Sequence, residues 1–184
     1  MDQRETEDAA LASRASKGDE AAFGALMRRW KEPLYRFIRR YVGDADEAYD
    51  LLQEAFTAAW ANLSRYDSKR PFSAWLRRIA LNKCRDYARR RSVRAFFFRA
   101  KSLNDPSIQI GAAAKNDDED LLGRLAHLDQ AIAALPDGLK APLILCALEG
   151  RSHAEAAQIL GLTPKAVELR IARARAKLAM LYQA

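Results

Sequence analysis

Apolar residues recur at three- and four-residue steps along most of the chain, the spacing that places them on one face of an α-helix. The first such stretch follows a capping residue, Asp19, and predicts one long helix or a helix pair broken near Pro33. Its apolar positions are Phe23, Leu26, Met27, Trp30, Leu34, Phe37, Ile38 and Tyr41. No stretch alternates with period two for long enough to form a strand, so the chain is predicted to be all-α.

Two further helices are predicted in the N-terminal half. One begins at Asp44, where Asp44 and Glu47 fit a capping box in its Asp variant, and runs through Leu63. Its apolar stripe comprises Ala48, Leu52, Phe56, Ala59 and Leu63. The other helix follows Pro71 and extends to about Arg91.

The periodic pattern fails between residues 92 and 121, where Pro, Gly, Asn and Asp occur without a repeat. This composition is typical of a flexible linker. We therefore predict two small helical domains, residues 1–95 and 124–184, joined by a linker at 96–123. Within the linker, the cluster Phe96–Phe98 is expected to pack back onto the first domain, because exposed aromatic clusters favour aggregation.

The chain closes with a predicted helix-turn-helix. Ser152 and Glu155 form a capping box at the start of its first helix, and Gly161 permits the tight turn that follows. Thr163 then caps the second helix, and Pro164 occupies its first position. In DNA-binding proteins with this motif the second helix enters the major groove.

The second helix of the motif segregates apolar from charged residues. One narrow stripe should pack against the rest of the domain, and it comprises Val167, Ile171, Ala174 and Leu178. Small residues in front and cations on the flanks suit a helix in a groove between phosphates, although a solvated terminal helix is the simpler alternative. The residues predicted to contact duplex DNA are Lys165, Glu168, Leu169, Arg170, Ala172, Arg173, Arg175 and Lys177. Glu168 can accept from cytosine N4, and Leu169 can contact a thymine methyl.

Charge is distributed unevenly over the 184 residues, whose formal net charge is +7. Residues 65–101 hold 13 Lys and Arg against 2 Asp and Glu, and residues 151–184 hold 6 against 2, whereas the remaining segments are net acidic. Basic zones confined to particular helices are typical of a protein that binds a polyanion, and also of solvated helix faces.

The first basic zone combines cations with aromatic residues. The loop at 64–72 carries Tyr66 and Phe72 among three cations, and the helix after it presents a polar stripe of Arg78, Asn82, Arg85 and Arg89. Cations and aromatic rings together suit single-stranded DNA, which needs a groove for its backbone and flat surfaces for unstacked bases. For Phe72 and Trp75 we favour core packing.

The helix that begins at Asp44 has an acidic face opposite its apolar stripe. This face comprises Asp46, Asp50, Gln53, Glu54 and Thr57. Because acidic side chains repel DNA, the face should meet solvent or a basic protein partner, and the residues alone leave both open.

Several classes of protein are excluded by composition. No apolar run approaches the roughly 20 residues of a membrane span, and the N-terminus is unlike a signal peptide, so we expect a cytoplasmic protein without membrane insertion. Cys84, Cys146, His127 and His153 lack the spacing of metal ligands, and we expect neither metal nor cofactor. No catalytic constellation is present, so we expect no enzyme.

Four stretches together resemble the extracytoplasmic-function sigma factors, which are two-domain bacterial transcription initiation factors. They are 44–60, 72–91, 132–163 and 164–178, and they occur in the family's order and spacing over nearly the whole chain. The resemblance implies a sigma-two helical bundle and a sigma-four helix-turn-helix joined by the linker. It also implies core RNA polymerase, promoter DNA in double-stranded and melted form, and an anti-sigma factor as partners.

The resemblance gives each surface a role. The acidic helix would dock on the clamp helices of the largest polymerase subunit through Asp50, Leu51, Gln53, Glu54 and Phe56. The loop and basic helix would hold the melted promoter and capture an extruded base through Tyr66, Lys69, Arg70, Arg78, Asn82, Arg85, Asp86 and Arg89. The sigma-four domain would read the upstream promoter element as duplex.

The chain departs from the family pattern at His153, where relatives often carry Ser or Thr, and at Glu168 and Leu169 in the helix that reads DNA. The base preference is therefore expected to differ from that of better-known relatives. Two other functions fit less well. A sigma-like decoy that sequesters an anti-sigma regulator has no need of a basic recognition helix, and a dimeric repressor needs a dimerisation helix that is not evident.

Overall fold

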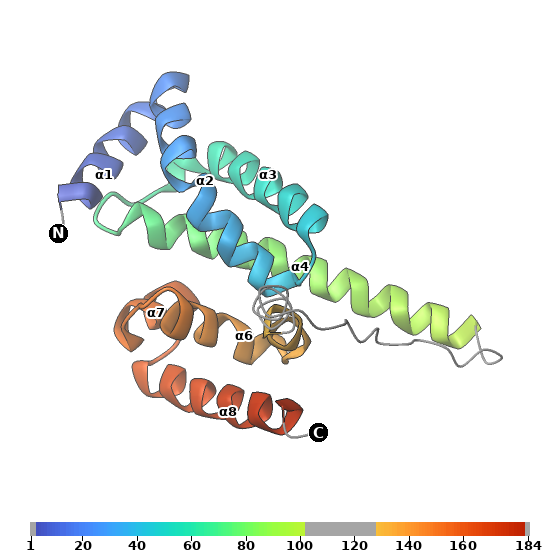
Figure 1. Cartoon of the computed structure of the whole chain (residues 1–184). Coiled ribbons are helices and arrows are strands. Elements are labelled where there is room, and N and C mark those ends of the chain that lie inside the picture. The colour runs from blue at the N-terminus through green and yellow to red at the C-terminus, as the bar shows by residue number, and fades with distance from the viewer. Residues whose placement is uncertain (1–2, 102–127, 183–184) are drawn as a thin grey trace, which may run out of the picture.

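The computed structural model describes residues 3–101 and 128–182, and every regular element in these ranges is helical (Figure 1). The N-terminal group comprises α1 (Gln3–Ala15), α2 (Glu20–Val42), α3 (Ala45–Ala61), a 3₁₀ turn η1 (Leu63–Arg65) and α4 (Phe72–Lys101). Helical residues 128–134 open the C-terminal group, followed by α6 (Asp137–Leu143), a π-helical turn η2 (Ile144–Leu148), α7 (His153–Leu160) and α8 (Pro164–Tyr182). The prediction of an all-α fold is confirmed.

Helices α2 and α3 form an antiparallel pair with well-defined ends. Asp19 Oδ1 accepts a hydrogen bond of 2.9 Å from the amide of Ala22, and α2 then continues through Pro33 as one helix. The chain reverses at Gly43, whose φ of 82° lies in the left-handed region that glycine tolerates best. Asp44 Oδ1 then caps α3 by accepting from the amide of Glu47 at 3.0 Å.

The apolar stripes predicted for α2 and α3 meet in the core of the first domain. Five residues predicted for the α3 stripe are buried, namely Ala48, Leu52, Phe56, Ala59 and Leu63. On α2, Met27 is the exception, since 38% of it is exposed. The period of the apolar residues therefore predicts the packing faces of both helices.

A buried carboxylate fastens α1 to α2. Asp8 is only 2% exposed, and it accepts from Arg29 Nη1 at 2.6 Å and from Trp30 Nε1 at 2.9 Å. Two guanidinium groups also lie over the Trp30 ring, with Arg4 5.9 Å and Arg77 5.3 Å from its centre. Helix α1 was not among the predicted elements, because its buried positions are two alanines and this aspartate.

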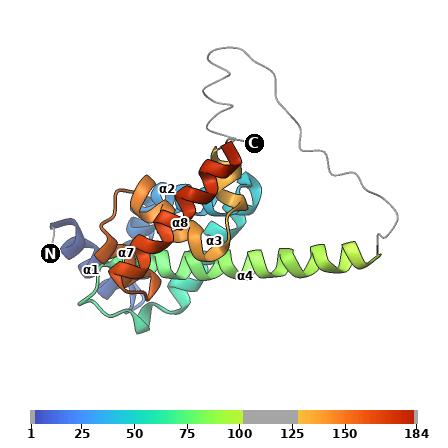
Figure 2. The same ribbon diagram turned by 90° about the horizontal axis from the view of Figure 1, so that it is seen from below.

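Helix α4 continues to Lys101, beyond the predicted helix end near Arg91 and across the predicted domain boundary at residue 95. It projects past the other helices (Figure 2). Although the apolar period is lost after Arg91, the segment contains neither Gly nor Pro, so nothing in it terminates a helix. The predicted packing of Phe96–Phe98 concerns side chains outside the described part of the structure.

The second domain lies against α2 and α4 of the first (Figures 1 and 2). Arg77 Nε of α4 donates to Glu149 Oε2 at 2.8 Å, and the two side chains are only 6% and 12% exposed. Nearby, Lys140 Nζ lies 5.2 Å from the centre of the Tyr41 ring. Buried residues of both domains form one continuous hydrophobic cluster, so the domains share an interface.

Candidate nucleic-acid and polymerase interfaces

The predicted helix-turn-helix is present as α7 and α8. Ser152 and Glu155 form both halves of the capping box, and Gly161 makes the turn with a φ of 67°. Thr163 Oγ1 accepts from the amide of Ala166 at 3.2 Å, which fixes the start of α8 at Pro164. These local contacts set which residues of α8 face outward.

Helix α8 packs through the predicted stripe. Val167 and Ala174 are fully buried, Ile171 is 5% exposed, and Leu178 is half-buried. The outward residues Glu168, Leu169, Ala172 and Arg173 are exposed, and Leu169 leaves 49% of its surface uncovered. An exposed leucine at the front of a basic helix is suited to contact an apolar group such as a thymine methyl.

The cations of α8 differ in their exposure and in their partners. Arg173, Arg175 and Lys177 are exposed and form no ion pair with any described residue. Lys165, in contrast, lies 3.0 Å from the carboxylate of Glu168. Arg170 is half-buried and reaches towards α6, where a Cβ placed on Gly138 would lie 4.0 Å from its Nη1. The three unpaired cations are therefore the ones best placed for phosphates.

The loop between η1 and α4 is held by an aromatic cluster. The Tyr66 hydroxyl donates to the carbonyl of Arg70 at 2.7 Å, and the Tyr66 ring lies 5.5 Å from Phe72 and 5.2 Å from Trp75. Burial raises the pKa of Tyr66 to about 12, so its hydroxyl remains a donor at neutral pH. Phe72 is 1% exposed, which agrees with its predicted place in the core.

A cavity of about 540 Å³ lies beside this loop. Its cationic lining consists of Lys69, Arg70 and Arg78, and Trp75 contributes a half-buried aromatic surface. Gln158 of α7 closes another side of the cavity. Cations around an aromatic wall are the chemistry that an unstacked nucleobase and its phosphate require.

Further along α4 the predicted polar stripe is only partly free. Arg78, Asn82 and Arg89 are exposed and Arg85 is half-buried. Asp86 Oδ1 accepts from Arg89 Nη2 at 2.9 Å, which partly neutralises that arginine. Arg78, in contrast, has no carboxylate partner among the described residues.

The predicted acidic face of α3 lies at the surface, where Asp46 and Thr57 are exposed and Glu54 is half-buried. Asp50 and Gln53 are exposed, and Glu54 forms an ion pair of 3.2 Å with Lys83 of α4. Leu51 and Phe56, predicted to join this surface, are only 2% and 5% exposed because they belong to the core between α2, α3 and α4. A shallow cavity of about 500 Å³ is lined by Asp50, Gln53, Glu54, Thr57, Ala58, Ala61 and Lys83.

The thiol groups are poorly placed for chemistry. Cys84 is fully buried, and burial raises its pKa to about 12, so the reactive thiolate is suppressed. Burial also raises the pKa of Cys146, which is half-buried. Among the described residues there is no cluster of His, Cys, Asp and Glu side chains suited to a metal ion. The helices of the described ranges also include none that is long and apolar enough to span a bilayer.

The buried Arg77–Glu149 pair was not anticipated. Arg77 lies between Leu76 and Arg78 in the sequence and faces the apolar side of α4, where a charge requires a buried partner. The need of a buried charge for a counter-ion is therefore the feature of the sequence that could have indicated an ion pair at Arg77. The partner itself, Glu149, is distant in sequence and could not be identified from local pattern.

Comparison with known families matches both domains. The Sigma-70 region 2 model matches residues 26–94, and the Sigma-70, region 4 model matches residues 125–178. The ECF RNA polymerase sigma-E factor of Escherichia coli is 30% identical to this chain, over 91% of this chain and 90% of its own length. The chain therefore belongs to the extracytoplasmic-function sigma factors of the sigma-70 family.

Two relatives are more similar in sequence. The RNA polymerase sigma factors NccH of Alcaligenes xylosoxydans xylosoxydans and CnrH of Cupriavidus metallidurans are each 40% identical, over 96% and 98% of this chain and 95% and 96% of their own lengths. A solved structure of CnrH in complex with the cytosolic domain of CnrY aligns with a TM-score of 0.71, at 34% identity over 96% of this chain and 97% of CnrH.

Proposed function

We propose that this protein is an alternative sigma factor that binds core RNA polymerase, directs it to specific promoters and promotes their melting. The observation that carries the proposal is the presence of two different cationic surfaces in one member of this family. One is a recognition helix with unpaired cations, and the other is a cation-lined cavity with an aromatic wall.

Duplex recognition is assigned to α8. Arg173, Arg175 and Lys177 would contact phosphates and set the register of the helix in the major groove. Glu168 and Leu169, near the N-terminus of α8, would then meet base edges, where a carboxylate selects cytosine and an apolar side chain selects thymine.

Capture of unpaired DNA is assigned to the cavity beside the loop. Lys69, Arg70 and Arg78 would hold the phosphate backbone, and Trp75 would offer its face to an extruded base. Stacking on an aromatic ring contributes about 1–3 kcal/mol per base, which offsets the few kcal/mol needed to unstack it. Melting is then promoted by binding energy alone.

Polymerase docking is assigned to the acidic face of α3. Asp50 and Gln53 are exposed there beside the shallow cavity, and a basic or polar surface of the polymerase would complement them. CnrH was solved with the cytosolic domain of CnrY, and we propose that this chain also has a regulatory protein partner, an anti-sigma factor. The site of action is the cytoplasm, where transcription takes place.

Run-off transcription with purified core enzyme on a library of genomic fragments tests the proposal. We expect discrete transcripts that require this protein, and their start sites would reveal the promoter. If the chain binds neither polymerase nor DNA but binds a regulator, the decoy function replaces this one.

A further inference from the structure

We propose that the contact between the two domains is autoinhibitory: α7 closes one side of the single-strand cavity, and the Arg77–Glu149 ion pair holds it there. The inference rests on the proposed function, because it assumes that unpaired DNA binds in this cavity. It predicts that the second domain must move away from α4 before the melted promoter can be held.

Residues of both domains line the cavity. Lys69, Arg70, Trp75 and Arg78 line it from the loop and α4, and Gln158 lines it from α7. An extruded base remains attached to a backbone on both sides, so it needs an open approach as well as a pocket. Because α7 forms one wall, the closed arrangement restricts that approach to the α4 surface.

The ion pair is suited to hold the closed arrangement. Arg77 and Glu149 are 2.8 Å apart, and each is almost fully withdrawn from water. Burial lowers the pKa of Arg77, and the neighbouring carboxylate of Glu149 opposes this effect. Removing one partner would leave a buried charge without its counter-ion, and separating the domains would return that charge to water.

A second contact between the domains lies at the opposite end of the interface, beside a cavity of about 700 Å³. A Cβ placed on Gly43 would lie 2.6 Å from the Cβ of Ala133, so the Gly43 backbone contacts the Ala133 methyl group and leaves no space for a side chain between them. Lys140 lies over the Tyr41 ring in the same region. A larger side chain at position 133 that follows the direction of the alanine Cβ would therefore push the domains apart at this end.

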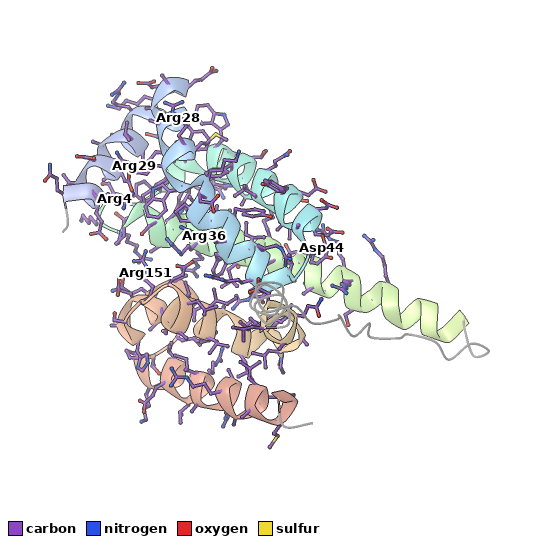
Figure 3. The ribbon with its side chains drawn as sticks, viewed as in Figure 1. Arg4, Arg28, Arg29, Arg36, Asp44 and Arg151 are labelled. Carbon is purple, nitrogen blue, oxygen red and sulfur yellow. The ribbon has the colours of Figure 1, made fainter. Side chains whose placement is uncertain are left out.

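Several arginines gather at the interface between the domains. A cavity of about 400 Å³ at the interface is lined by Arg36, Arg40, Arg77 and Arg151, with Glu149 as its only lining carboxylate among the described residues. Figure 3 labels Arg36 on α2 and Arg151 on the second domain, on the two sides of the boundary. Arg36 is paired with Glu32 at 3.9 Å and Arg151 with Glu155 at 3.0 Å, so their repulsion is reduced. Arg40, which has no ion pair with a described residue, lies in the same cavity as Arg77 and opposes closure.

The recognition helix is not blocked in the same way. Helix α8 lies on the side of the second domain that faces away from α4 (Figure 1), and its unpaired cations are exposed. The closed chain can therefore meet duplex DNA while its single-strand cavity is restricted. Binding of single-stranded DNA would then require the domains to separate, whereas binding of duplex DNA would not.

The test compares Ala133→Leu with Ala134→Leu in the full chain. Both substitutions add the same volume, keep the net charge and favour helix. Ala133 faces Gly43, whereas Ala134 is exposed and lines the neighbouring cavity, which has room for a larger side chain. The radius of gyration is measured by small-angle X-ray scattering, and affinity for a labelled mixed-sequence single-stranded oligonucleotide by fluorescence anisotropy. Circular dichroism verifies that each variant remains helical.

We expect Ala133→Leu to increase the radius of gyration and to raise single-strand affinity by about fivefold or more, while Ala134→Leu matches the wild type. Glu149→Arg should open the chain as well, and Arg77→Glu combined with Glu149→Arg should close it again at the wild-type net charge.

Two results would overturn the proposal in distinguishable ways. An opened chain that binds single strands no better than the wild type would show that closure does not inhibit. An opened chain that binds no single strand at all would refute the single-strand site itself, and with it the proposed melting activity. Failure of both Ala133→Leu and Glu149→Arg to open the chain would show that this interface does not hold the domains.

Discussion

The salt dependence of duplex binding offers a quantitative test of α8. Each phosphate contact by a cation steepens the fall of log K against log salt by about 0.9. Arg173, Arg175 and Lys177 are exposed and unpaired within the described structure, so α8 should contribute a slope of about 2.7. Between about 50 and 200 mM salt this corresponds to a loss of roughly 40-fold in affinity.

Removing one of these cations should reduce the slope by a defined amount. We expect Arg173→Ala to lower the slope of log K against log salt by about 0.9. Between the same two salt concentrations, the affinity of this variant should therefore fall by a factor about 3.5 times smaller than that of the wild type. The assay is fluorescence anisotropy with a labelled duplex of arbitrary sequence, since this term does not depend on sequence. Arg28→Ala removes the same charge from an exposed position on α2 and serves as the matched control.

Arg170→Ala provides an internal contrast on the same helix. Because Arg170 is half-buried and reaches towards Gly138, its removal should leave the slope nearly unchanged. The reasoning is refuted if Arg173→Ala behaves like Arg28→Ala. If instead Arg170→Ala lowers the slope as much as Arg173→Ala does, the guanidinium of Arg170 reaches phosphate despite its position beside α6.

Three further predictions concern other parts of the chain. Asp8→Ala should lower the free energy of unfolding by about 2–3 kcal/mol in chemical denaturation, because it removes the acceptor of the buried Trp30 N–H and one of the two carboxylates that bind Arg29. Asp50→Ala should weaken binding to core polymerase in a pull-down or titration without changing the slope for duplex DNA. Native Cys84 should resist alkylation by iodoacetamide until the protein unfolds, because it is buried with a raised pKa.

These predictions fail in separate ways. An Asp8→Ala protein as stable as the wild type would mean that the α1 contact contributes nothing to folding. Loss of duplex binding in Asp50→Ala would show that Asp50 does not act in polymerase binding alone. Rapid modification of Cys84 in the folded protein, followed by mass spectrometry, would reveal an opening of the first domain that its burial does not suggest.

Local features of the fold could be predicted because their causes lie close together in the sequence. The capping box of Ser152 and Glu155, the left-handed turn at Gly161 and the buried stripe of α8 all depend on residues within one or two helical turns. The end of α4 was predicted too early, because a lost apolar period was taken as a lost helix although no helix-breaking residue follows.

Features that depend on distant residues could not be predicted. The core positions of Leu51 and Phe56 follow from three helices that meet around α3, whereas their role in the polymerase surface came from resemblance alone. The pairing of Arg77 with Glu149, and the place of Gln158 in the cavity, depend on how the two domains meet. No period or motif within either domain encodes that contact.

The position of Trp30 gives the molecule a built-in optical sensor. Its indole N–H is bonded to Asp8, and its ring lies beside the guanidinium of Arg77, the residue that joins the two domains. The fluorescence of an indole responds to nearby charge. Separation of Glu149 from Arg77 should therefore shift the emission wavelength of Trp30. Trp75 lines the single-strand cavity, so a protein with Trp60 and Trp75 replaced by phenylalanine would report separation of the domains in the free chain, without any attached dye.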